Sequence, residues 1–596
     1  MEGGGPLGRY LWHVHVNGPG AALGGSLLEI FTSLRVGCYT PDTAASDSPR
    51  SLSALHRALM SLSPSAYRAW SLLLPLRRAP ALPSCNSTLR LSNPLRVPAS
   101  SSGSPCRHYS LLSQGGRAMD RHFSGSSSRD AGSSGCGGSG RKRRRSGVLA
   151  YIALGSNVGD RISMIEQACR EMDARGIKVK RTSSLWETKP MYVLDQNSFV
   201  NGACEVETGL EPRELLDELQ SIEKSMGRKK LVDKGPRNID LDILLYGDLE
   251  IDDERLIIPH IGIPEREFVL RPLAELVPHK LLSWQKPGKL IQDYLNELPL
   301  TDEPLSTLTP ISRSVGPLNG LKATRKTHVM AILNITPDSF SDGGIHTPDS
   351  LRDTIAAFIR GGATMLDIGG QSTAPGKIEI TPEEEISRVL PVIETVRSIP
   401  EARHVAISID TYRASVAEAA VRAGADMIND VSAGLMDPAM LPTMARLGKT
   451  VCLMHMRGTP GTMSRLNEYP DGLVPTIARE LLARVAAAEA AGVRRWRIVL
   501  DPGLGFAKLG EQNLQVLRHF DELRAWPGLR GLPWLVGSSR KSFIGKVTGV
   551  PKPMDRVFGT AATVAAAVQG GADIVRVHDV VEMGQVVKMA DAIWRY

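Results

Sequence analysis

The pattern of apolar and polar positions divides the chain into three regions. Residues 1–147 show no regular period, whereas residues 149–280 mix strand and helix periods. Within this second region, LAYIALGSN begins as a buried strand, and the following segment places Ile162, Ile165 and Met172 on one face of a helix. Strands and helices interspersed over such a length predict a compact α+β domain.

From residue 328 onward, apolar strands alternate regularly with amphipathic helices. Strand ends fall at intervals of about 35 residues, a spacing expected of βα units. These ends lie near Asn334, Asp367, Asp410, Asn429, His455, Asp501, Val536 and Val577. Eight such units predict an α/β fold of the (β/α)8 TIM-barrel type rather than an open doubly wound sheet. The polar residues at these ends should therefore share one rim.

The region without a period is rich in Ser, Gly, Pro and Arg. This composition cannot bury enough apolar surface to offset its ordering entropy, so we expect a disordered N-terminal leader. Leu52 to Arg78 combines Leu, Ala and Arg at roughly helical spacing, which is typical of an organellar transit peptide. We expect targeting to the mitochondrial matrix, with plastid and cytosol as alternatives. The basic cluster Arg141 to Arg145 is also compatible with a nuclear signal.

Charge and cysteine content narrow the class of protein. Residues 1–148 contain 18 Lys and Arg against 6 Asp and Glu, and the rest of the chain contains 53 against 57. The net charge of +8 thus belongs to the leader, and the body gives no reason to expect nucleic-acid binding. The seven cysteines include no CxxC pair, so neither a zinc site nor a disulfide framework is indicated. No apolar run reaches about 18 residues, and we expect no membrane span.

We expect four consecutive parts in the chain. They are a leader at 1–147, an α+β domain at 148–300, a linker at 301–326 and a barrel at 327–596.

The segment KGPRNIDLDILLYG carries the chemistry of the α+β domain. Strand alternation places Asp240 and Asp242 on one face, about 7 Å apart, while Leu241 and Ile243 point into the core. Paired carboxylates without a thiol or imidazole favour Mg²⁺. Nearby basic residues provide charge for a polyphosphate: Arg228, Lys229, Lys230, Lys234, Arg237, Arg255, His260 and Arg266. The alternative is a solvated ladder of surface charges.

Five motifs in this domain resemble one family. GSN, WETKP, FVNGA, GPRNIDLDILLYG and IIPH occur in the order found in 6-hydroxymethyl-7,8-dihydropterin pyrophosphokinase, and the resemblance covers nearly all of 149–280. It implies a ferredoxin-like α+β fold that transfers a pyrophosphoryl group from ATP to the hydroxymethyl oxygen of the pterin. It also implies that Asp240 and Asp242 hold two Mg²⁺ ions between the pterin oxygen and the nucleotide.

The same resemblance assigns further residues to the substrates. Phe199 and Phe268 would sandwich the pterin ring, with Thr188 and Asn201 at its polar edge. The residues implied for ATP binding are Glu223, Arg255, His260 and Arg266, and those implied to neutralise the transferring group are Arg228 and Arg237. Lys234 departs from the aromatic residue that the family often has before the GPR turn.

The barrel rim gathers polar residues of both charges. They are Asn334, Asp410, Asn429, Asp501, Lys541, Arg576 and His578. A single Asp or Asn after a strand is most often a helix cap, but seven such residues on one rim indicate a binding site. Carboxylates and amides can pair with the guanidine-like edge of a pterin, and the cations suit an anionic leaving group. The oxygen-rich loop at 334–344 suits Mg²⁺ and phosphate, or is a solvated turn.

Eight motifs along the barrel resemble dihydropteroate synthase over the whole of 328–596. They are NITPDSFSDGG, LDIGGQST, SIDT, INDVSAG, LMHMRGTP, DPGLGFAK, GSSRKSFIG and RVHDV. The resemblance implies that the pterin is held by Asp410, Asn429, Asp501 and Lys541, with Arg576 stacked on it. It implies that pyrophosphate or p-aminobenzoate is held by Asn334 through Mg²⁺ and by Thr373, Ser539, Arg576 and His578. Loops 334–344 and 371–377 are expected to close over the site.

The two halves together resemble the fused pyrophosphokinase and synthase of plants, protists and fungi. The resemblance implies consecutive steps of folate synthesis, with hydroxymethyldihydropterin, ATP and p-aminobenzoate as substrates. A homo-oligomer through the barrel helices is expected. The alternatives are a methyltetrahydrofolate-dependent methyltransferase barrel and a catalytically degraded pterin-binding scaffold.

The second barrel loop departs from the family pattern. The family commonly has Ser-Thr-Arg-Pro there, whereas residues 372–375 are Ser-Thr-Ala-Pro. The missing arginine removes a charge-assisted contact of about 1.5–3 kcal/mol. We therefore predict weak binding of p-aminobenzoate and sulfonamides, with Ala374→Arg lowering the p-aminobenzoate KM and the sulfonamide inhibition constant. Steady-state kinetics that leave both constants unchanged would contradict this prediction.

Overall fold

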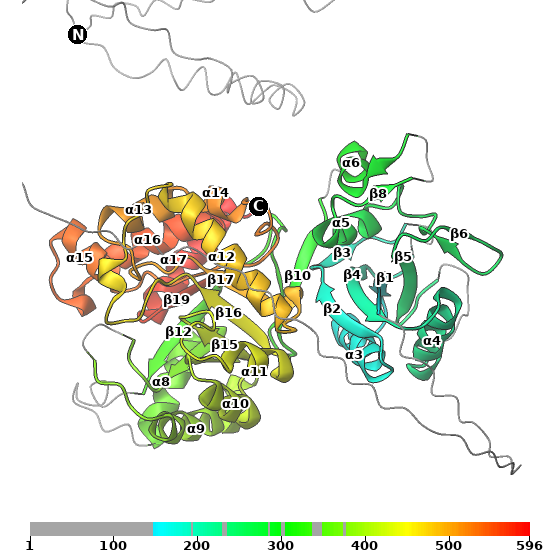
Figure 1. The fold of residues 1–596 in the computed structure, drawn as a ribbon. Coiled ribbons are helices and arrows are strands. Elements are labelled where there is room, and N and C mark those ends of the chain that lie inside the picture. Colours follow the sequence, from blue (N-terminus) through cyan, green and yellow to red (C-terminus); the bar gives the residue numbers. More distant parts are fainter. Residues whose placement is uncertain are drawn as a thin grey trace, which may run out of the picture. The chain divides into compact units, whose positions relative to one another are not determined.

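The computed structural model describes residues 147–191, 195–228, 235–283, 287–299, 304–335, 348–373 and 377–596. Several predictions from the sequence fall outside these ranges. They concern the leader, the basic residues Lys229, Lys230 and Lys234, the loop residues 336–347, and Ala374 with its neighbours 375 and 376. The described residues belong to one compact unit with two α/β-containing domains (Figure 1).

The first domain is built on one antiparallel sheet, and its described residues also form helices. Its strands are β1 (Val148–Ser156), β2 (Lys178–Thr182), β3 (Leu185–Thr188), β4 (Phe199–Thr208) and β5 (Asp240–Tyr246), with the short pairs β6 (Ile251–Asp252) and β7 (Ile257–Ile258), and β8 (Leu281–Leu282) and β9 (Lys289–Leu290). Its helices are α3 (Arg161–Ala174), α4 (Pro212–Ser225), α5 (Glu267–Leu276) and α6 (Ile291–Glu297). Pro212 occupies the first turn of α4, where its missing N–H is not needed.

Alternation along β1 and β5 separates two cores in this domain. Ile152 and Leu154 pack with α3 and α4, whereas Ala153 faces the core formed by α5 and α6. On β5, Leu241 belongs to the first core and Leu244 to the second. Because side chains alternate across a strand, the two carboxylates of β5 face the α5 side.

The segment expected to be a linker contains a strand pair. β10 (Ser306–Ser312) and β11 (Gly316–Asn319) form an antiparallel hairpin, and β10 also pairs with β3 of the first domain. Ile311 and Leu318 of this hairpin pack against residues inside the barrel, including Met330. The hairpin was hidden in the sequence because Pro310, Pro317 and the Ser/Thr residues between its apolar positions obscure a strand period.

The second domain confirms the predicted barrel. Its strands are β12 (His328–Asn334), β13 (Met365–Gly369), β14 (Ala406–Asp410), β15 (Met427–Asp430), β16 (Thr450–Met454), β17 (Ile498–Asp501), β18 (Leu535–Val536) and β19 (Ile574–Val577). They pair in parallel in the order β17-β16-β15-β14-β13-β12-β19-β18. A parallel bridge between Leu500 and Trp534 joins β17 to the segment before β18 and so brings the two edges together.

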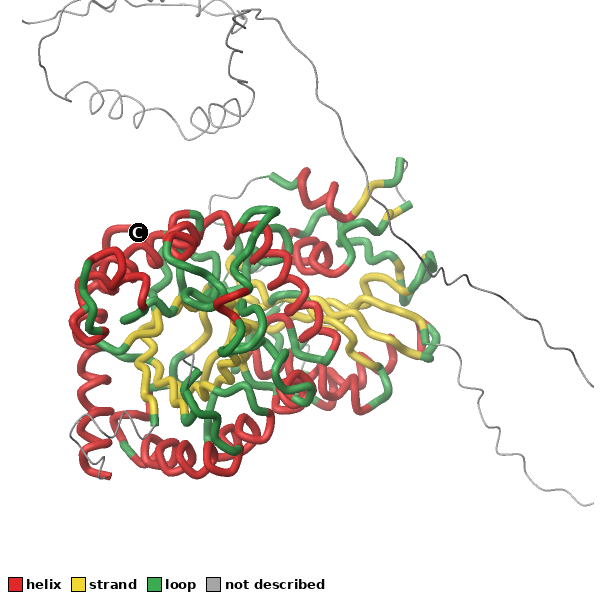
Figure 2. Tube along the Cα trace, turned by 60° about the vertical axis from the view of Figure 1, so that its left-hand side comes forward, coloured by secondary structure: helices red, strands yellow, loops and turns green. Residues whose placement is uncertain are grey.

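Helices cover the outside of the barrel strands (Figure 2). They are α8 (Pro348–Gly361), α9 (Pro382–Ser398), α10 (Ala414–Ala423), α11 (Met440–Leu447), α12 (Leu473–Ala490), α13 (Glu511–Arg518), α14 (Phe520–Arg524), α15 (Ser542–Thr548), α16 (Val557–Gln569) and α17 (Val580–Trp594). Four short 3₁₀ helices complete the connections: η3 (Pro400–His404), η4 (Met463–Arg465), η5 (Arg495–Arg497) and η6 (Pro553–Asp555).

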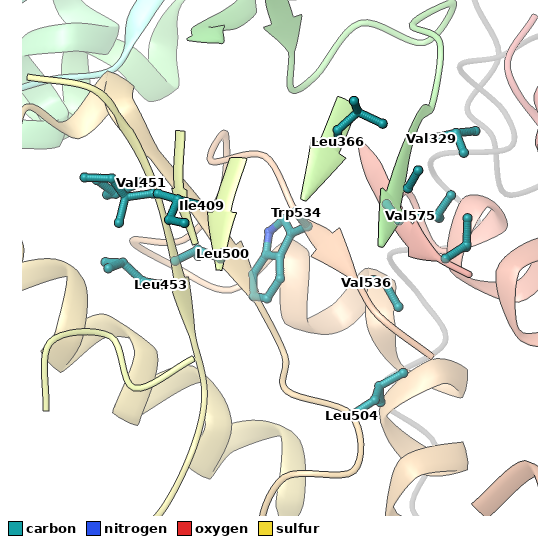
Figure 3. Packing of buried hydrophobic residues seen from close by; sticks show 14 of the residues in the cluster. Val329, Leu366, Ile409, Val451, Leu453, Leu500, Leu504, Trp534, Val536 and Val575 are labelled. Carbon is teal, nitrogen blue, oxygen red and sulfur yellow. The ribbon is translucent and has the colours of Figure 1, made fainter. Parts of the chain in front are cut away.

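The main core of this domain lies between the barrel strands and the surrounding helices. Figure 3 shows part of it, with Val329, Val451 and Trp534 among the buried residues. The Trp534 indole meets the Phe520 ring edge-on, with 5.5 Å between centroids. Such close packing fixes the strand ends, and hence the rim, with little freedom.

The described helices and cysteines were compared with two expectations from the sequence, the absence of a membrane span and of a disulfide framework. Within the described ranges, no helix is long and apolar enough to cross a membrane. Cys169, Cys204 and Cys452 are free and buried. Among these residues the cysteines therefore act as small apolar core groups.

Candidate functional site

A cavity of about 140 Å³ opens beside β5 in the first domain. Most residues that the sequence assigned to substrates in this domain line it. They are Thr188, Phe199, Asn201, Arg237, Asp240, Asp242, His260, Arg266 and Phe268. Residues from five separate segments of the chain thus converge on one pocket, which only the folded sheet and α5 bring together.

The two aspartates occupy the start of β5, where the strand pairs with β1. Asp240 lies opposite Gly155 and Asp242 opposite Ala153. A Cβ atom on Gly155 would lie 3.2 Å from the Asn201 side-chain oxygen, so glycine lets the carboxylates and the amide approach closely. Although the Asp242 carboxylate opens into the pocket, desolvation by surrounding protein and the charge of Asp240 raise its pKa to about 6.

Two arginines pair with Asp240 from opposite sides. Arg228 Nη2 lies 2.8 Å from one carboxylate oxygen, and Arg237 Nη1 lies 2.6 Å from the other. Arg228 also pairs with Glu223. Burial raises the pKa of Glu223 to about 7, against the lowering effect of Arg228 and of the Leu241 backbone N–H. Glu223 and Arg228 are not among the residues that line the pocket, but Arg228 connects both acids, Glu223 and Asp240, beside it.

The aromatic residues of the pocket each face a cation. The Arg237 guanidinium lies 5.6 Å from the centre of the Phe199 ring, and that of Arg266 lies 5.9 Å from the Phe268 ring. Asn201 Nδ2 donates a 2.8 Å hydrogen bond to the Thr188 hydroxyl, which fixes the amide orientation. Two apolar faces with an oriented amide between them can recognise a flat heterocycle by stacking and hydrogen bonding.

His260 and Arg255, both assigned to ATP from the sequence, lie in different surroundings. His260 lines the pocket and accepts a hydrogen bond from Gly262 N at Nδ1. Burial and the Arg266 charge lower the pKa of His260, which keeps the ring neutral. Arg255 is not among the pocket residues; it is half exposed and pairs with Asp217 on α4 at 2.6 Å.

The donor set of the pocket fits Mg²⁺ held jointly with a substrate. Among the described residues, no three His, Cys, Asp or Glu side chains converge as a complete metal site. Mg²⁺ is commonly bound by one or two carboxylates with phosphate oxygens and water completing the shell. The pair Asp240 and Asp242 meets that requirement.

In the barrel, strand pairing places the predicted rim residues at one level. Asn334 is in register with Gly369, Gly369 with Asp410, and Asp410 with Asn429. Asp501 ends β17 in register with Met454. The C-terminal ends of neighbouring parallel strands thus deliver these oxygens to one mouth, as predicted from the strand ends.

A buried ionic network lies just below this level. Arg576 pairs with Asp367 and, at 2.6 Å, with Asp410, and Asn429 Nδ2 donates to Asp367 at 3.2 Å. Burial and the neighbouring Asp367 raise the pKa of Asp410 to about 7, although Arg576 opposes the shift. Arg576 is therefore held by carboxylates on β13 and β14.

Asp367 was not predicted as a site residue. It is fully buried and contacts both Arg576 and Asn429. A carboxylate set among apolar residues two positions before a strand end was the available signal. The motif LDIGGQST contained it, but its partner Arg576 lies 209 positions away and only the closed barrel brings them together.

Lys541 and Asp501 carry opposite charges and interact electrostatically. Asp501 accepts a 2.7 Å hydrogen bond from Gly503 N, and Lys541 donates to the Leu504 carbonyl and lies 4.9 Å from the centre of the Phe506 ring. Burial lowers the pKa of Lys541 to about 8, against the raising effect of Asp501. Lys541 is thus held by the loop that follows β17.

His578 and Ser539 lie together at the remaining side of the mouth. His578 Nδ1 is 3.0 Å from the Ser539 hydroxyl, whose oxygen also accepts from His578 N. Burial, and then the charges of Arg540 and Arg576, lower the pKa of His578 to about 3. Arg540 has a positive φ of 60° and pairs with Asp579, which joins the Ser539 loop to the start of α17. Thr373, the remaining predicted residue, directly precedes the undescribed residues 374–376.

Comparisons with known proteins agree with this division of sites. The family of 7,8-dihydro-6-hydroxymethylpterin-pyrophosphokinase (HPPK) matches residues 151–278, and the family of pterin binding enzymes matches residues 330–578. The chain is 41% identical to the mitochondrial folate synthesis bifunctional protein of Arabidopsis thaliana, over 74% of this chain and 83% of that protein. It is 42% identical to the counterpart from Pisum sativum, over 74% and 88%.

The chain is also similar to a fungal protein and to a solved structure. The folic acid synthesis protein fol1 of Pneumocystis carinii is 48% identical over 75% of this chain, but the chain spans only 60% of that protein's length. A Plasmodium falciparum HPPK-DHPS solved with pteroate has a TM-score of 0.63 at 22% identity, covering 76% of this chain and 98% of that one. At this identity the likeness concerns the fold.

The fold and its two sites define a tandem pterin protein, with a pyrophosphokinase-type domain followed by a pterin-binding barrel. The chain belongs to the family of bifunctional folate synthesis proteins.

Proposed function

We propose that the chain catalyses two consecutive reactions of folate synthesis. The first transfers pyrophosphate from ATP to 6-hydroxymethyl-7,8-dihydropterin and releases AMP. The second condenses the resulting diphosphate with p-aminobenzoate, which yields 7,8-dihydropteroate and pyrophosphate. The observation that carries this proposal is the presence of two separate pterin-type sites in one chain, one with paired carboxylates beside β5 and one with a charged barrel mouth.

In the first site, the pterin would lie between Phe199 and Phe268, with Asn201 at its polar edge. Mg²⁺ bound by Asp240 and Asp242 would neutralise the phosphate oxygens as the pyrophosphoryl group moves. Arg228 and Arg237, which now pair with Asp240, are placed to exchange part of that contact for the oxygens of the transferring group. Glu223, His260 and Arg266 are proposed to bind ATP, and Arg255 would do so only if the exposed pair with Asp217 opens.

In the barrel, Asp410, Asn429 and Asp501 would accept hydrogen bonds from the amino edge of the pterin. Lys541 and Arg576 would lie beside the ring, and His578 with Ser539 would face the pyrophosphate. As the C–O bond to pyrophosphate breaks, negative charge grows on the leaving group and positive charge on the pterin. These fixed charges stabilise both, and the p-aminobenzoate nitrogen then attacks the exposed carbon. Asn334 with Mg²⁺ and Thr373 complete the proposed anion site.

One experiment distinguishes this function from a methyltransferase barrel and from an inactive pterin-binding scaffold. The chain is incubated with hydroxymethyldihydropterin, ATP, Mg²⁺ and p-aminobenzoate, and products are separated by chromatography. The proposal expects both AMP and dihydropteroate. A methyltransferase would yield no dihydropteroate, and a scaffold would yield neither product.

The Asp410 carboxylate gives the synthase a predicted pH dependence. Because the pKa of Asp410 is raised to about 7 in the free protein, the group gains a proton as pH falls below that value. A protonated carboxyl accepts fewer hydrogen bonds from the pterin edge, so kcat/KM for the pterin diphosphate should fall below about pH 7. The groups that face Asp410 are Asp367, Arg576, Glu385 and Asp430.

Rates with supplied pterin diphosphate across pH 5.5–8.5 test this prediction. Asp410→Asn should lower kcat/KM and flatten the profile, because the variant has no proton to gain at this position. Identical profiles in the two proteins would show that another group titrates.

We propose a homo-oligomer through the barrel. Phe558 on α16 is 89% exposed, and Val547, Met554, Met589 and Ile593 add exposed apolar area on α15, η6 and α17. Exposed apolar side chains on neighbouring helices are a feature of interaction sites. Phe558→Asp should convert the oligomer to a monomer in light scattering coupled to size exclusion. An unchanged molar mass would contradict this surface as the interface.

We propose that the protein is located in the mitochondrial matrix, with plastid and cytosol as alternative locations. The support is the leader composition together with the mitochondrial names of the relatives from Arabidopsis thaliana and Pisum sativum. A fluorescent fusion of residues 1–147 tests it, and diffuse cytosolic fluorescence would overturn it.

A further inference from the structure

Lys508 belongs to the loop that joins β17 to α13, and its side chain is buried beneath the loop backbone. Its side chain is only 3% exposed. The ammonium nitrogen lies 2.8 Å from His455 Nδ1, 3.1 Å from the Gly503 carbonyl and 3.1 Å from the Phe506 carbonyl. An ammonium group has three N–H donors, and here each one has an acceptor. Two of these acceptors belong to the loop itself.

His455 connects Lys508 to the outer helices. Its Nε2 lies 2.8 Å from a carboxylate oxygen of Glu480 on α12. Since Nδ1 accepts from Lys508, the proton must lie on Nε2 and point at Glu480. Arg457 binds the same carboxylate through three contacts of 2.6–3.1 Å. The result is a hydrogen-bonded chain that runs inward from the partly exposed Arg457 and Glu480 through the buried His455 to the buried Lys508.

The loop above Lys508 adopts a conformation that needs support. Ala507 has a φ of +49°, which non-glycine residues rarely adopt, and a Cβ on Gly503 would lie 2.0 Å from the His455 carbonyl oxygen. Such backbone is maintained only where surrounding contacts fix it. Lys508 supplies these contacts from below, and the Tyr469 hydroxyl donates to the Ala507 carbonyl at 2.8 Å.

The other side of this loop holds Lys541. The Leu504 carbonyl accepts a hydrogen bond from the Lys541 ammonium, and the Phe506 ring lies 4.9 Å from it. A Cβ on Gly505 would lie 3.1 Å from Lys541 Cδ, so the backbone itself forms the wall against which this lysine rests. One loop thus lies between a structural lysine and a lysine of the proposed site.

We propose that Lys508, with His455 and Glu480, is a positioning group for the synthase reaction that fixes the 502–508 loop and thereby the place of Lys541 and Phe506. Lys508 has its three donors occupied inside the protein and does not need to contact substrate. This role rests on the proposed synthase function, and it adds a residue that acts only through the loop.

Lys508→Met tests the proposal in the full chain, with supplied pterin diphosphate and p-aminobenzoate. The variant leaves the loop carbonyls without their donor, so synthase kcat/KM should fall by about 10- to 100-fold, the size expected when a reacting group is slightly misplaced. Pyrophosphokinase activity of the same chain should stay within about twofold, because the first domain has its own site. Lys546→Met, on the exposed surface of α15, is the matched control and should leave both activities unchanged.

A double-mutant cycle separates positioning from general destabilisation. If Lys508 acts through the loop, Lys508→Met should lower synthase kcat/KM by a much smaller factor in a Phe506→Ala background than in the native chain. Glu480→Gln, at a partly exposed side chain, should give a smaller loss of synthase activity in the same direction. The proposal is overturned if both activities of Lys508→Met fall together, if synthase activity is unchanged, or if the cycle is additive. If the native chain itself has no synthase activity, the proposed function is contradicted instead.

Discussion

Asp242→Asn should reduce the pyrophosphokinase kcat by about 10²- to 10³-fold, as removal of a charge-stabilising group commonly does. The substitution keeps the size of the side chain but removes one of two carboxylates that face the pocket from β5. The remaining Asp240 is already shared by Arg228 and Arg237, so it cannot replace the lost charge toward Mg²⁺. Initial rates of AMP formation at saturating ATP measure the effect.

Two controls accompany this experiment. Synthase activity with supplied pterin diphosphate should stay within about twofold, because the barrel site has its own residues. Asp248→Asn removes an exposed carboxylate after β5 that pairs with Lys280 and should leave the kinase rate nearly unchanged. A kinase rate in Asp242→Asn within threefold of the native rate would show that this carboxylate does not hold the metal.

Arg576→Met should abolish synthase activity and also weaken the barrel. The guanidinium is the common partner of Asp367 and Asp410, and Asp367 is fully buried. Removing one partner of a buried ion pair costs about 3–5 kcal/mol in the free energy of unfolding, because the remaining charge loses its compensation. The two carboxylates would then share a proton, which removes the charged acceptor proposed for the pterin edge.

Denaturant unfolding and synthase rates together measure this prediction. The surface variant Arg530→Met, which changes an exposed arginine, should match the native chain in both assays. If Arg576→Met retains native stability, the network with Asp367 and Asp410 does not stabilise the barrel. If it retains synthase activity, Arg576 has no part in the reaction.

Much of the fold could be predicted because its signals are local. The apolar strand runs and the helical stripes follow from neighbouring residues, and Asn334, Asp410 and Asp501 end β12, β14 and β17 as expected. The alternation that placed Asp240 and Asp242 on one face is equally local. These parts depend on periods that a single strand or helix already contains.

The parts that the sequence did not indicate depend on distant contacts. Asp367 resembled an ordinary strand residue until the closed barrel placed it against Arg576. Lys508 was not singled out in the sequence, yet it is buried beside His455 in the fold. The β10–β11 hairpin was missed because Pro310 and Pro317 obscure its period, and because β10 gains its partner β3 only in the folded domain. Such features are set by tertiary neighbours and leave no period in the chain.

The central claim is that one chain makes a pterin diphosphate and then consumes it. ATP labelled in its γ-phosphoryl group tests this most directly, with hydroxymethyldihydropterin and Mg²⁺ present and p-aminobenzoate added second. The account predicts that the label first appears in the pterin diphosphate and moves to free pyrophosphate only after p-aminobenzoate is added, in an amount equal to the dihydropteroate formed. Label that stays in ATP, or that remains in the pterin diphosphate after the second addition, would contradict it.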